Sequence, residues 1–230
     1  MPAVALVSPK GGAGKTTAAL LLALGLRERG FRVAMIDADP NKPLFHWAGL
    51  PGRPEGISVH AAPTLQDMPD ALREARRKSP DWIILDTEGS VRGALAFTTM
   101  RLDLIVTPLA GSKLEALQAI KASEMVGELG ARSSRHLVHR CLLTRVQAAI
   151  RPRGLKAVVE ELRSHDIELL NTALIEKEAY RALFAIGGGF DALEAQGVTG
   201  VASARQNAAA FVDAVLDVID AAQAAEKRPA

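Results

Sequence analysis

Residues 8–17, Ser-Pro-Lys-Gly-Gly-Ala-Gly-Lys-Thr-Thr, stand between a short apolar run (3–7) and a long helical pattern that starts at Lys15. A strand, a glycine-rich turn and a helix in immediate succession restrict the fold strongly. This order directs backbone N–H groups and the positive end of the helix dipole at one point. Gly11, Gly12 and Gly14 permit backbone conformations that are closed to other residues. The segment therefore predicts a loop that encloses phosphate groups.

Each polar side chain of this loop has an expected partner on bound Mg-ATP. Lys15 is expected to bridge the β- and γ-phosphates, the Thr16 hydroxyl to ligate Mg²⁺, and Thr17 to contact the α-phosphate. The predicted cofactors are therefore ATP and Mg²⁺, and the remaining cofactor-binding positions are Lys10, Gly11, Gly12, Ala13 and Gly14. The strict P-loop pattern has glycine where this chain has Pro9. The alternative is an ordinary glycine-rich turn.

Short apolar runs alternate with longer helical patterns along the whole chain, which indicates a doubly wound α/β fold with helices on both faces of a mostly parallel sheet. This is the P-loop NTPase fold, and we expect one domain over residues 1–230. The expected strands are 3–7, 32–37, 57–61, 82–86, 104–107, 137–144 and 168–174. The expected helices are 15–29, 65–78, 113–129, 154–164, 179–184 and 203–225.

Composition limits the cellular setting of the chain. Hydrophobic residues make up 48% and aromatic residues 4%, so the core must consist mainly of aliphatic side chains. A single cysteine, Cys141, excludes a disulfide framework or a cysteine-based metal cluster within one chain. The longest apolar run, Ala18–Leu26, is far shorter than the roughly 20 residues of a membrane span. We expect a cytoplasmic protein that does not bind membranes.

Carboxylates follow two of the predicted strands at their ends. Asp37 and Asp39 end the second strand, and Asp86 ends the fourth, where it is expected to hold a water bound to Mg²⁺. Two alternatives stay open: Asp39 and Pro40 as a helix N-cap pair, and Asp86 as a turn residue. Glu88 is either a second carboxylate near the γ-phosphate or an exposed loop acid.

Basic residues are concentrated between residues 131 and 159, where seven occur without one acidic residue, while the rest of the chain is net negative. Guanidinium groups suit phosphate oxygens, and no aromatic residue interleaves the segment for base stacking. We therefore predict binding to the backbone of duplex DNA, largely independent of sequence. The favoured residues are Arg132, Arg135, Arg151, Arg153 and Lys156, whereas Arg140 and Arg145 lie on or near a strand. The alternative is that these side chains scatter over several faces or form ordinary salt bridges.

The run from Lys10 to Thr17 resembles the deviant Walker A motif of the ParA/MinD ATPases, in which Lys10 takes the place of the signature lysine. Residues 33–40 and 82–87 are similar to the second acidic motif and the Walker B strand of that family. Residues 142–146 and 174–189 look like its later segments, and they put Gly187–Gly189 near the adenine. The run 39–48 resembles the short ParA-like branch of plasmid-partition and VirC-type proteins. We expect this short form, without a separate DNA-binding domain before the P-loop.

This resemblance implies a reaction and its residues, with Lys10, Lys15, Asp37 and Asp39 as the catalytic set. In this resemblance, Asp39 orients the attacking water. Asp37 supports both Mg²⁺ and the switch region, and Thr16 and Asp86 are the other residues that hold Mg²⁺. A carboxylate with an ordinary pKa is a poor base for water, so turnover should be slow. Lys10 crosses to the nucleotide of a partner subunit in an ATP-sandwiched homodimer; its alternative is an exposed surface lysine.

The resemblance also implies partners. An ATP-dependent homodimer would bind double-stranded DNA without sequence preference, associate with the nucleoid, and be reset by hydrolysis that a small DNA-binding adaptor protein stimulates. The alternative is a MinD-like membrane-associated positioning ATPase. That function requires a basic amphipathic C-terminal helix, whereas the segment from Asp213 to Ala225 is acidic and rich in alanine. The related iron–sulfur reductases require paired cysteines.

Overall fold

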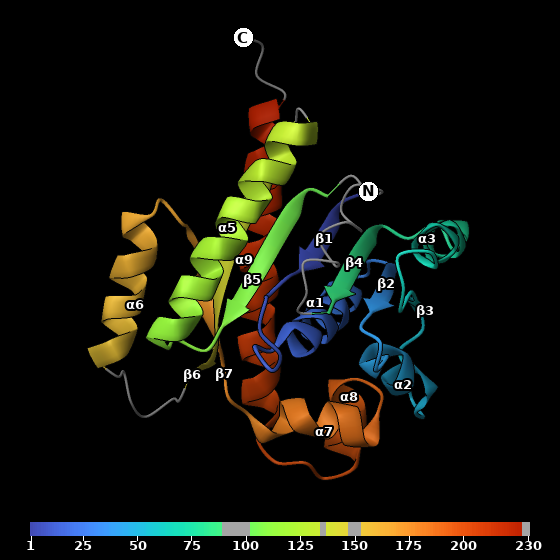
Figure 1. The fold of residues 1–230 in the computed structure, drawn as a ribbon. Helices are drawn as coiled ribbons and strands as arrows, with labels where there is room; N and C mark the ends of the chain where they lie inside the picture. The colour runs from blue at the N-terminus through green and yellow to red at the C-terminus, as the bar shows by residue number, and fades with distance from the viewer. Residues whose placement is uncertain (89–101, 134–136, 147–152, 227–230) are drawn as a thin grey trace.

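The computed structural model describes residues 1–88, 102–133, 137–146 and 153–226 of the chain (Figure 1). Within them, seven strands form one sheet in the order β3-β2-β4-β1-β5-β6-β7, and every pairing is parallel. The strands are β1 (Ala3–Leu6), β2 (Val33–Ala38), β3 (Ile57–Ala61), β4 (Trp82–Thr87), β5 (Leu104–Leu109), β6 (Val138–Val146) and β7 (Leu169–Ile175). Each was predicted to within two residues at both ends, and the doubly wound α/β fold is confirmed.

Helices cover both faces of this sheet, with α5 and α9 on opposite sides (Figure 1). The helices of one face are α1 (Lys15–Glu28), α2 (Pro43–Gly49), α7 (Glu178–Ile186), α8 (Phe190–Ala195) and α9 (Val201–Glu226). Those of the other face are α3 (Met68–Arg77), α5 (Lys113–Ser133) and α6 (Arg153–Ser164). The sequence did not predict α2 and α8, because helices of seven and six residues are too short to show a helical period.

Because helices cover both faces of the sheet, its strands can be apolar along their whole length. In β1, Val4 and Leu6 pack against the α1 side, whereas Ala3 and Ala5 pack against the α3 side. Because neither face of the strand meets water, no polar alternation is needed.

The apolar run Ala18–Leu26 lies in α1, which is enclosed between the sheet and α9; every residue of the run is buried. Its unbroken hydrophobicity is therefore that of a core helix. Among the helices of the described residues, none has both the length and the apolar character of a membrane-crossing helix.

The strand order brings together segments that are far apart in the chain. β1 lies between β4 and β5, so the segments that follow these three strands leave the same edge of the sheet. In a parallel sheet this is the point where the chain changes winding direction and where ligands bind.

Gly25 tests the packing of α1 on α9. A methyl group at this position would stand 2.5 Å from Cγ2 of Val212. We expect Gly25→Ala to lower the free energy of unfolding by about 1–3 kcal/mol in a urea titration, despite the better helix propensity of alanine. Adding Val212→Ala should restore part of this loss. The control is Gly127→Ala on α5, where a methyl group meets no atom within 4 Å and should stabilise the helix. Equal stability of the two alanine variants would contradict the close approach.

Candidate nucleotide-binding site

The turn between β1 and α1 has the backbone of a phosphate-binding loop. Gly12 and Gly14 have φ angles of 78° and 95°, in the left-handed region that favours glycine. Gly14 is the N-cap of α1, and no side chain caps this helix end. The Thr144 hydroxyl, at the end of β6, donates to the Ala13 carbonyl at 2.8 Å and holds the loop from outside. The uncapped N–H groups of the first helical turn are the donors that phosphates require.

A cavity of about 530 Å³, here named the phosphate cavity, opens over this loop. Its lining residues are Pro9, Gly11, Gly12, Gly14, Lys15, Thr16, Thr17, Asp39, Asn41, Glu88 and Arg145. Lys15 is buried, and its ammonium donates to the Lys10 carbonyl at 3.3 Å. Burial lowers the pKa of Lys15, and the carboxylates of Asp86, Asp39 and Glu88 only partly oppose this effect. A desolvated cation in a polar cavity fits an anionic ligand.

Thr16 and Asp86 form a pair that fits Mg²⁺. The Thr16 hydroxyl donates to Asp86 Oδ2 at 2.7 Å, while the buried Asp86 Oδ1 has no hydrogen-bond partner. Burial raises the pKa of Asp86 to about 7, and the hydrogen bond from Thr16 opposes this rise. The described residues contain no group of three or more side chains that could hold a metal alone. Mg²⁺ would thus take most of its ligands from phosphates and water, as this ion usually does.

Asp37 anchors the start of α2. Its Oδ2 accepts the Phe45 N–H at 2.9 Å, and its Oδ1 accepts the Asp39 N–H at 3.3 Å. Burial raises the pKa of Asp37, and the backbone donors oppose this. Asp37 therefore ties the segment that carries Asp39 to the sheet, and its part in holding Mg²⁺ stays a prediction.

Asp39 lines the phosphate cavity, and its Oδ1 accepts the backbone and side-chain N–H groups of Asn41 at 2.8 and 3.0 Å. The N-cap of α2 is Lys42, in a left-handed conformation. The interpretation of Asp39 and Pro40 as a helix N-cap pair is therefore wrong.

Lys10 does not line the phosphate cavity of its own subunit. Its ammonium lies 3.2 Å from Glu115 Oε1, on the first turn of α5, and its side chain is 49% exposed. Glu88 is exposed and lines the phosphate cavity, and a place near the γ-phosphate stays a prediction.

Sequence reasoning missed Arg145 as a site residue. It follows Thr144 at the carboxyl end of β6, with a φ of 54°, and its guanidinium Nη2 reaches to 3.9 Å from a methyl group built on Gly12. Such left-handed conformations of residues other than glycine cluster at functional sites. The position of Arg145 at the end of a predicted strand could have identified it, because ligands of parallel sheets bind at the carboxyl ends of strands.

A smaller cavity of about 150 Å³ shares Gly14, Thr17 and Arg145 with the phosphate cavity. Its other walls come from the end of β7 and from Tyr180, Arg181 and Phe184 of α7. It adjoins the phosphate cavity and has partly apolar walls. Gly187 and Gly188 pack against the loop 50–52.

The predicted DNA-binding residues fall on two helices. Arg132 lies in the last turn of α5, whereas Arg153 and Lys156 lie in the first turn of α6. Both helices start at the edge of the sheet that carries the nucleotide site, so the last turn of α5 lies toward the opposite edge (Figure 1). Lys156 is 84% exposed and lies 3.8 Å from Glu160. Arg135 and Arg151 lie outside the described residues.

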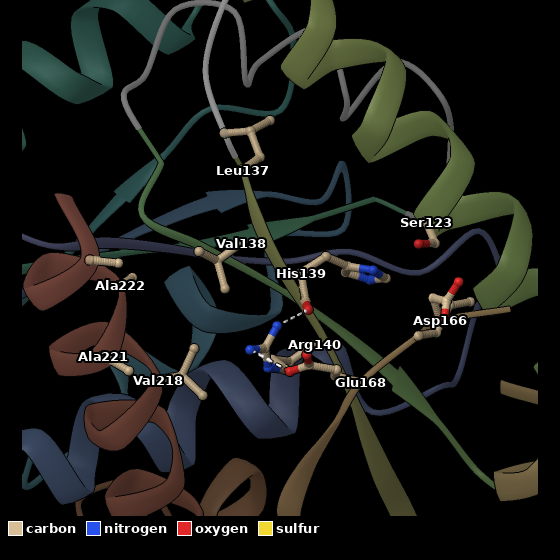
Figure 2. Close-up of a pocket in the computed structure, with 12 residues that line it drawn as sticks. Ser123, Leu137, Val138, His139, Arg140, Asp166, Glu168, Val218, Ala221 and Ala222 are labelled. Carbon is tan, nitrogen blue, oxygen red and sulfur yellow. Dashed lines mark hydrogen bonds and ion pairs between the residues drawn. The ribbon is translucent and has the colours of Figure 1, made fainter. Parts of the chain in front are cut away.

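A further cavity, of about 600 Å³, is lined by residues 137–140 at the amino end of β6 and by Val218, Ala221 and Ala222 of α9 (Figure 2). The Arg140 guanidinium donates to the His139 carbonyl at 2.8 Å and pairs with Glu168 at 2.5 Å across its floor. Burial lowers the pKa of His139 to about 4, which leaves this ring neutral. Nothing in this cavity resembles a phosphate site, and Arg140 is occupied by a local ion pair.

Comparison with known proteins agrees with this geometry. Residues 4–185 match the family described as the CobQ/CobB/MinD/ParA nucleotide binding domain. The chain is 30% identical to Protein ParA of Rhizobium radiobacter, over 94% of this chain and 96% of that protein. It is 27% identical to Protein virC1 of Rhizobium rhizogenes, over 80% of each.

Solved structures show the same fold at lower identity. An ATP complex of McdA from Cyanothece aligns with a TM-score of 0.72 at 16% identity, over 94% of this chain and 96% of that one. The septum site-determining protein MinD of Pyrococcus horikoshii, complexed with Mg-ADP, aligns with a TM-score of 0.69 at 16% identity, over 96% and 98%.

Asp86→Asn tests two properties of this carboxylate separately: the stability lost by burying its charge, and its part in the response to Mg²⁺. At pH 8, above the pKa of about 7 that burial gives Asp86, the ionised carboxylate costs more free energy to bury than a neutral amide would. We expect the Tm of the nucleotide-free variant to rise by a few degrees, which corresponds to about 1–3 kcal/mol. Adding Mg²⁺ to the ATP-bound variant should then raise the Tm far less than in the parent protein. Differential scanning fluorimetry measures both effects.

The control is Asp103→Asn, because Asp103 accepts the Ala3 N–H at 2.8 Å at the opposite edge of the sheet. This variant should lose stability and keep the full response to Mg²⁺. A full Mg²⁺ response in Asp86→Asn would remove Asp86 from the metal site.

Proposed function

Because the chain belongs to the CobQ/CobB/MinD/ParA nucleotide-binding family, whose ParA and MinD members are P-loop ATPases, we propose that it is a ParA-like ATPase that partitions or positions DNA. In this proposal Mg-ATP drives the formation of a sandwich dimer, the dimer binds duplex DNA without sequence preference, and slow hydrolysis resets the switch. The match to Protein ParA over nearly the full length of both chains supports it. The exposed Lys10, turned out of its own phosphate cavity, is the observation that carries the dimer.

Within one subunit, the P-loop binds the nucleotide and neutralises its charge. Lys15 and the N–H groups at the start of α1 hold the phosphates, and Thr16 and Asp86 hold the metal. When bound, Mg²⁺ neutralises charge on the β- and γ-phosphates. Asp39, on the wall of the cavity, holds the attacking water in line, and Asp37 keeps the segment of Asp39 in place through its hydrogen bond to Phe45.

The surface around the phosphate cavity suits a second copy of the chain. Of the exposed large apolar side chains in the described residues, Phe45 is 49% exposed, Leu114 60% and Leu117 45%. Phe45 lies on α2, after Asp39, and the two leucines flank Glu115 on α5, beside Lys10. Covering these side chains in a dimer would add hydrophobic stabilisation to the phosphate contacts of Lys10.

DNA contact is proposed for the start of α6. Arg153 and Lys156 lie in its first turn, and Arg151 precedes it. A monomer offers few phosphate contacts, whereas a dimer doubles them, so the nucleotide state would control DNA affinity. In the cell this predicts nucleoid association and a small DNA-binding adaptor that stimulates hydrolysis. Co-sedimentation with liposomes in place of DNA would instead indicate a membrane-associated positioning ATPase.

Asp39→Ala tests the hydrolysis step. The variant should bind ATP as the parent does, hydrolyse it about a hundredfold more slowly, and accumulate as an ATP-bound dimer. Steady-state phosphate release and sedimentation velocity measure the two effects. Asp70→Ala, which removes an exposed carboxylate on α3, should change neither.

Adding Lys10→Ala to Asp39→Ala should dissolve the dimer and leave ATP bound, whereas adding Lys113→Ala should not. If Asp39→Ala hydrolyses ATP at the parental rate, another group positions the water. If no variant dimerises with ATP, the sandwich dimer is excluded.

Charge reversal at α6 tests the DNA contact. In the Asp39→Ala background, the Arg153→Glu/Lys156→Glu variant should bind unrelated duplexes at least about tenfold more weakly with ATP. The salt dependence should also flatten, by about one unit of slope for each lost phosphate contact. Fluorescence anisotropy over a salt series, with ATP and with ADP, gives both quantities.

The control is Arg73→Glu/Arg77→Glu on α3, which changes the net charge equally. These arginines pair with Asp70 and Glu74 at 2.9 and 2.6 Å, as Lys156 pairs with Glu160. Equal losses in both double variants would indicate a general charge effect, and undiminished binding would place the contacts elsewhere.

A further inference from the structure

Lys10 and Glu115 form an ion pair between two segments that are 105 residues apart. Lys10 follows β1, and Glu115 follows β5, the strand next to β1 in the sheet. The ammonium of Lys10 lies 3.2 Å from Glu115 Oε1. The wall of the phosphate cavity includes Pro9, Gly11 and Gly12 but not Lys10. The pair thus holds the lysine beside α5 and out of its own phosphate cavity.

Glu115 is built into the helix start and does not depend on Lys10 for its place. Its Oε2 accepts the Ser112 N–H at 3.2 Å and the Ser112 hydroxyl at 3.1 Å, while the Glu115 N–H donates to Ser112 Oγ at 3.3 Å. This is the reciprocal capping box of a helix N-terminus. The side chain is only 9% exposed, against 49% for Lys10. A buried carboxylate with its own backbone and hydroxyl donors therefore holds a half-exposed cation.

The charge of Glu115 is maintained by these contacts. Burial alone would raise the pKa of Glu115, but the hydrogen bonds from Ser112 and Lys10 outweigh it and keep this pKa below its ordinary value. Glu115 is thus a carboxylate at neutral pH. When Lys10 leaves, Oε1 loses a charged partner in a largely buried place, which disfavours the departure.

We propose that Glu115 restrains Lys10 within its own subunit, and that release of this ion pair sets the protein concentration at which the ATP-bound chain dimerises. The inference rests on the proposed sandwich dimer, in which Lys10 contacts the nucleotide of the other subunit. Glu115 is then a positioning residue that acts through Lys10. It opposes premature dimerisation, because two ion pairs must break for each dimer that forms.

Glu115→Gln tests the restraint, since glutamine keeps an oxygen for Ser112 and lacks the charge that attracts Lys10. In the Asp39→Ala background with saturating Mg-ATP, sedimentation velocity should show a dimer Kd about tenfold lower than without the substitution. ATP affinity, titrated at a protein concentration below dimer formation, should stay the same. Glu124→Gln, an exposed glutamate on the same helix, should change neither quantity. Glu115→Asp should return the Kd toward that of the parent.

The added Lys10→Ala substitution decides whether the effect runs through Lys10. Because Lys10→Ala weakens the dimer, the comparison is made at the highest protein concentration at which residual association can be measured, and there Glu115→Gln should no longer lower the dimer Kd. Should Glu115→Gln fail to fold, Ser112→Ala loosens the same carboxylate and should shift the Kd in the same direction by a smaller factor.

A dimer Kd that is unchanged or higher at equal ATP affinity would overturn the restraint, and a higher one would show that Glu115 instead supports Lys10 in the dimer. A lower Kd that persists with Lys10→Ala would also overturn it. Absence of any ATP-dependent dimer in the Asp39→Ala parent would reject the dimer itself, which is a distinct result.

Discussion

The turn from β1 into α1 is the constraint on which the site depends. Both elements are buried almost completely, β1 in the middle of the sheet and α1 between the sheet and α9, so neither can move to relieve the loop between them. The loop must reverse direction within a few residues, which Gly12 and Gly14 permit through left-handed conformations. The hydrogen bond from Thr144 to Ala13 fixes it further. A rigid set of backbone donors results, and such preorganisation is what phosphate binding requires.

Charged groups are buried beside this loop at a cost in stability. Lys15, Asp37 and Asp86 are all buried. Burial lowers the pKa of the lysine and raises the pKa of both aspartates, which in each case favours the neutral form. Asp86 keeps an oxygen without a hydrogen-bond partner, which folded proteins rarely tolerate. Their burial destabilises the protein without a ligand, and in the proposed Mg-ATP complex a phosphate and a divalent cation would supply the missing partners. The site thus couples ligand binding to stability.

Two further features connect the site to surfaces where a partner could act. Asp37 holds the N-terminal end of α2 by accepting the Phe45 N–H, and the Phe45 side chain is exposed on that helix. Glu115 holds Lys10 from the start of α5, where two leucines are exposed. Both links run from the carboxyl edge of the sheet outward, along helices that begin there. The opposite edge, with its cavity and the Arg140–Glu168 pair, has no comparable link to the phosphates in the described residues.

The sequence by itself determined the seven strands, the long helices, the P-loop and its family, because each depends on local patterns: apolar runs, a 3.6-residue period, and glycines next to Lys15 and Thr16. It also indicated Asp37, Asp39 and Asp86, since each ends a predicted strand. Only the tertiary structure decided which distant segments meet at the site. Thr144 and Arg145 at the end of β6, and Glu115 at the start of α5, reach the loop after β1 because the sheet order places β5 beside β1 and β6 beside β5. Strand order depends on long-range packing, which a local pattern does not encode. Arg132 and Lys156 lie toward opposite edges of the fold because one ends α5 and the other begins α6, with β6 between them.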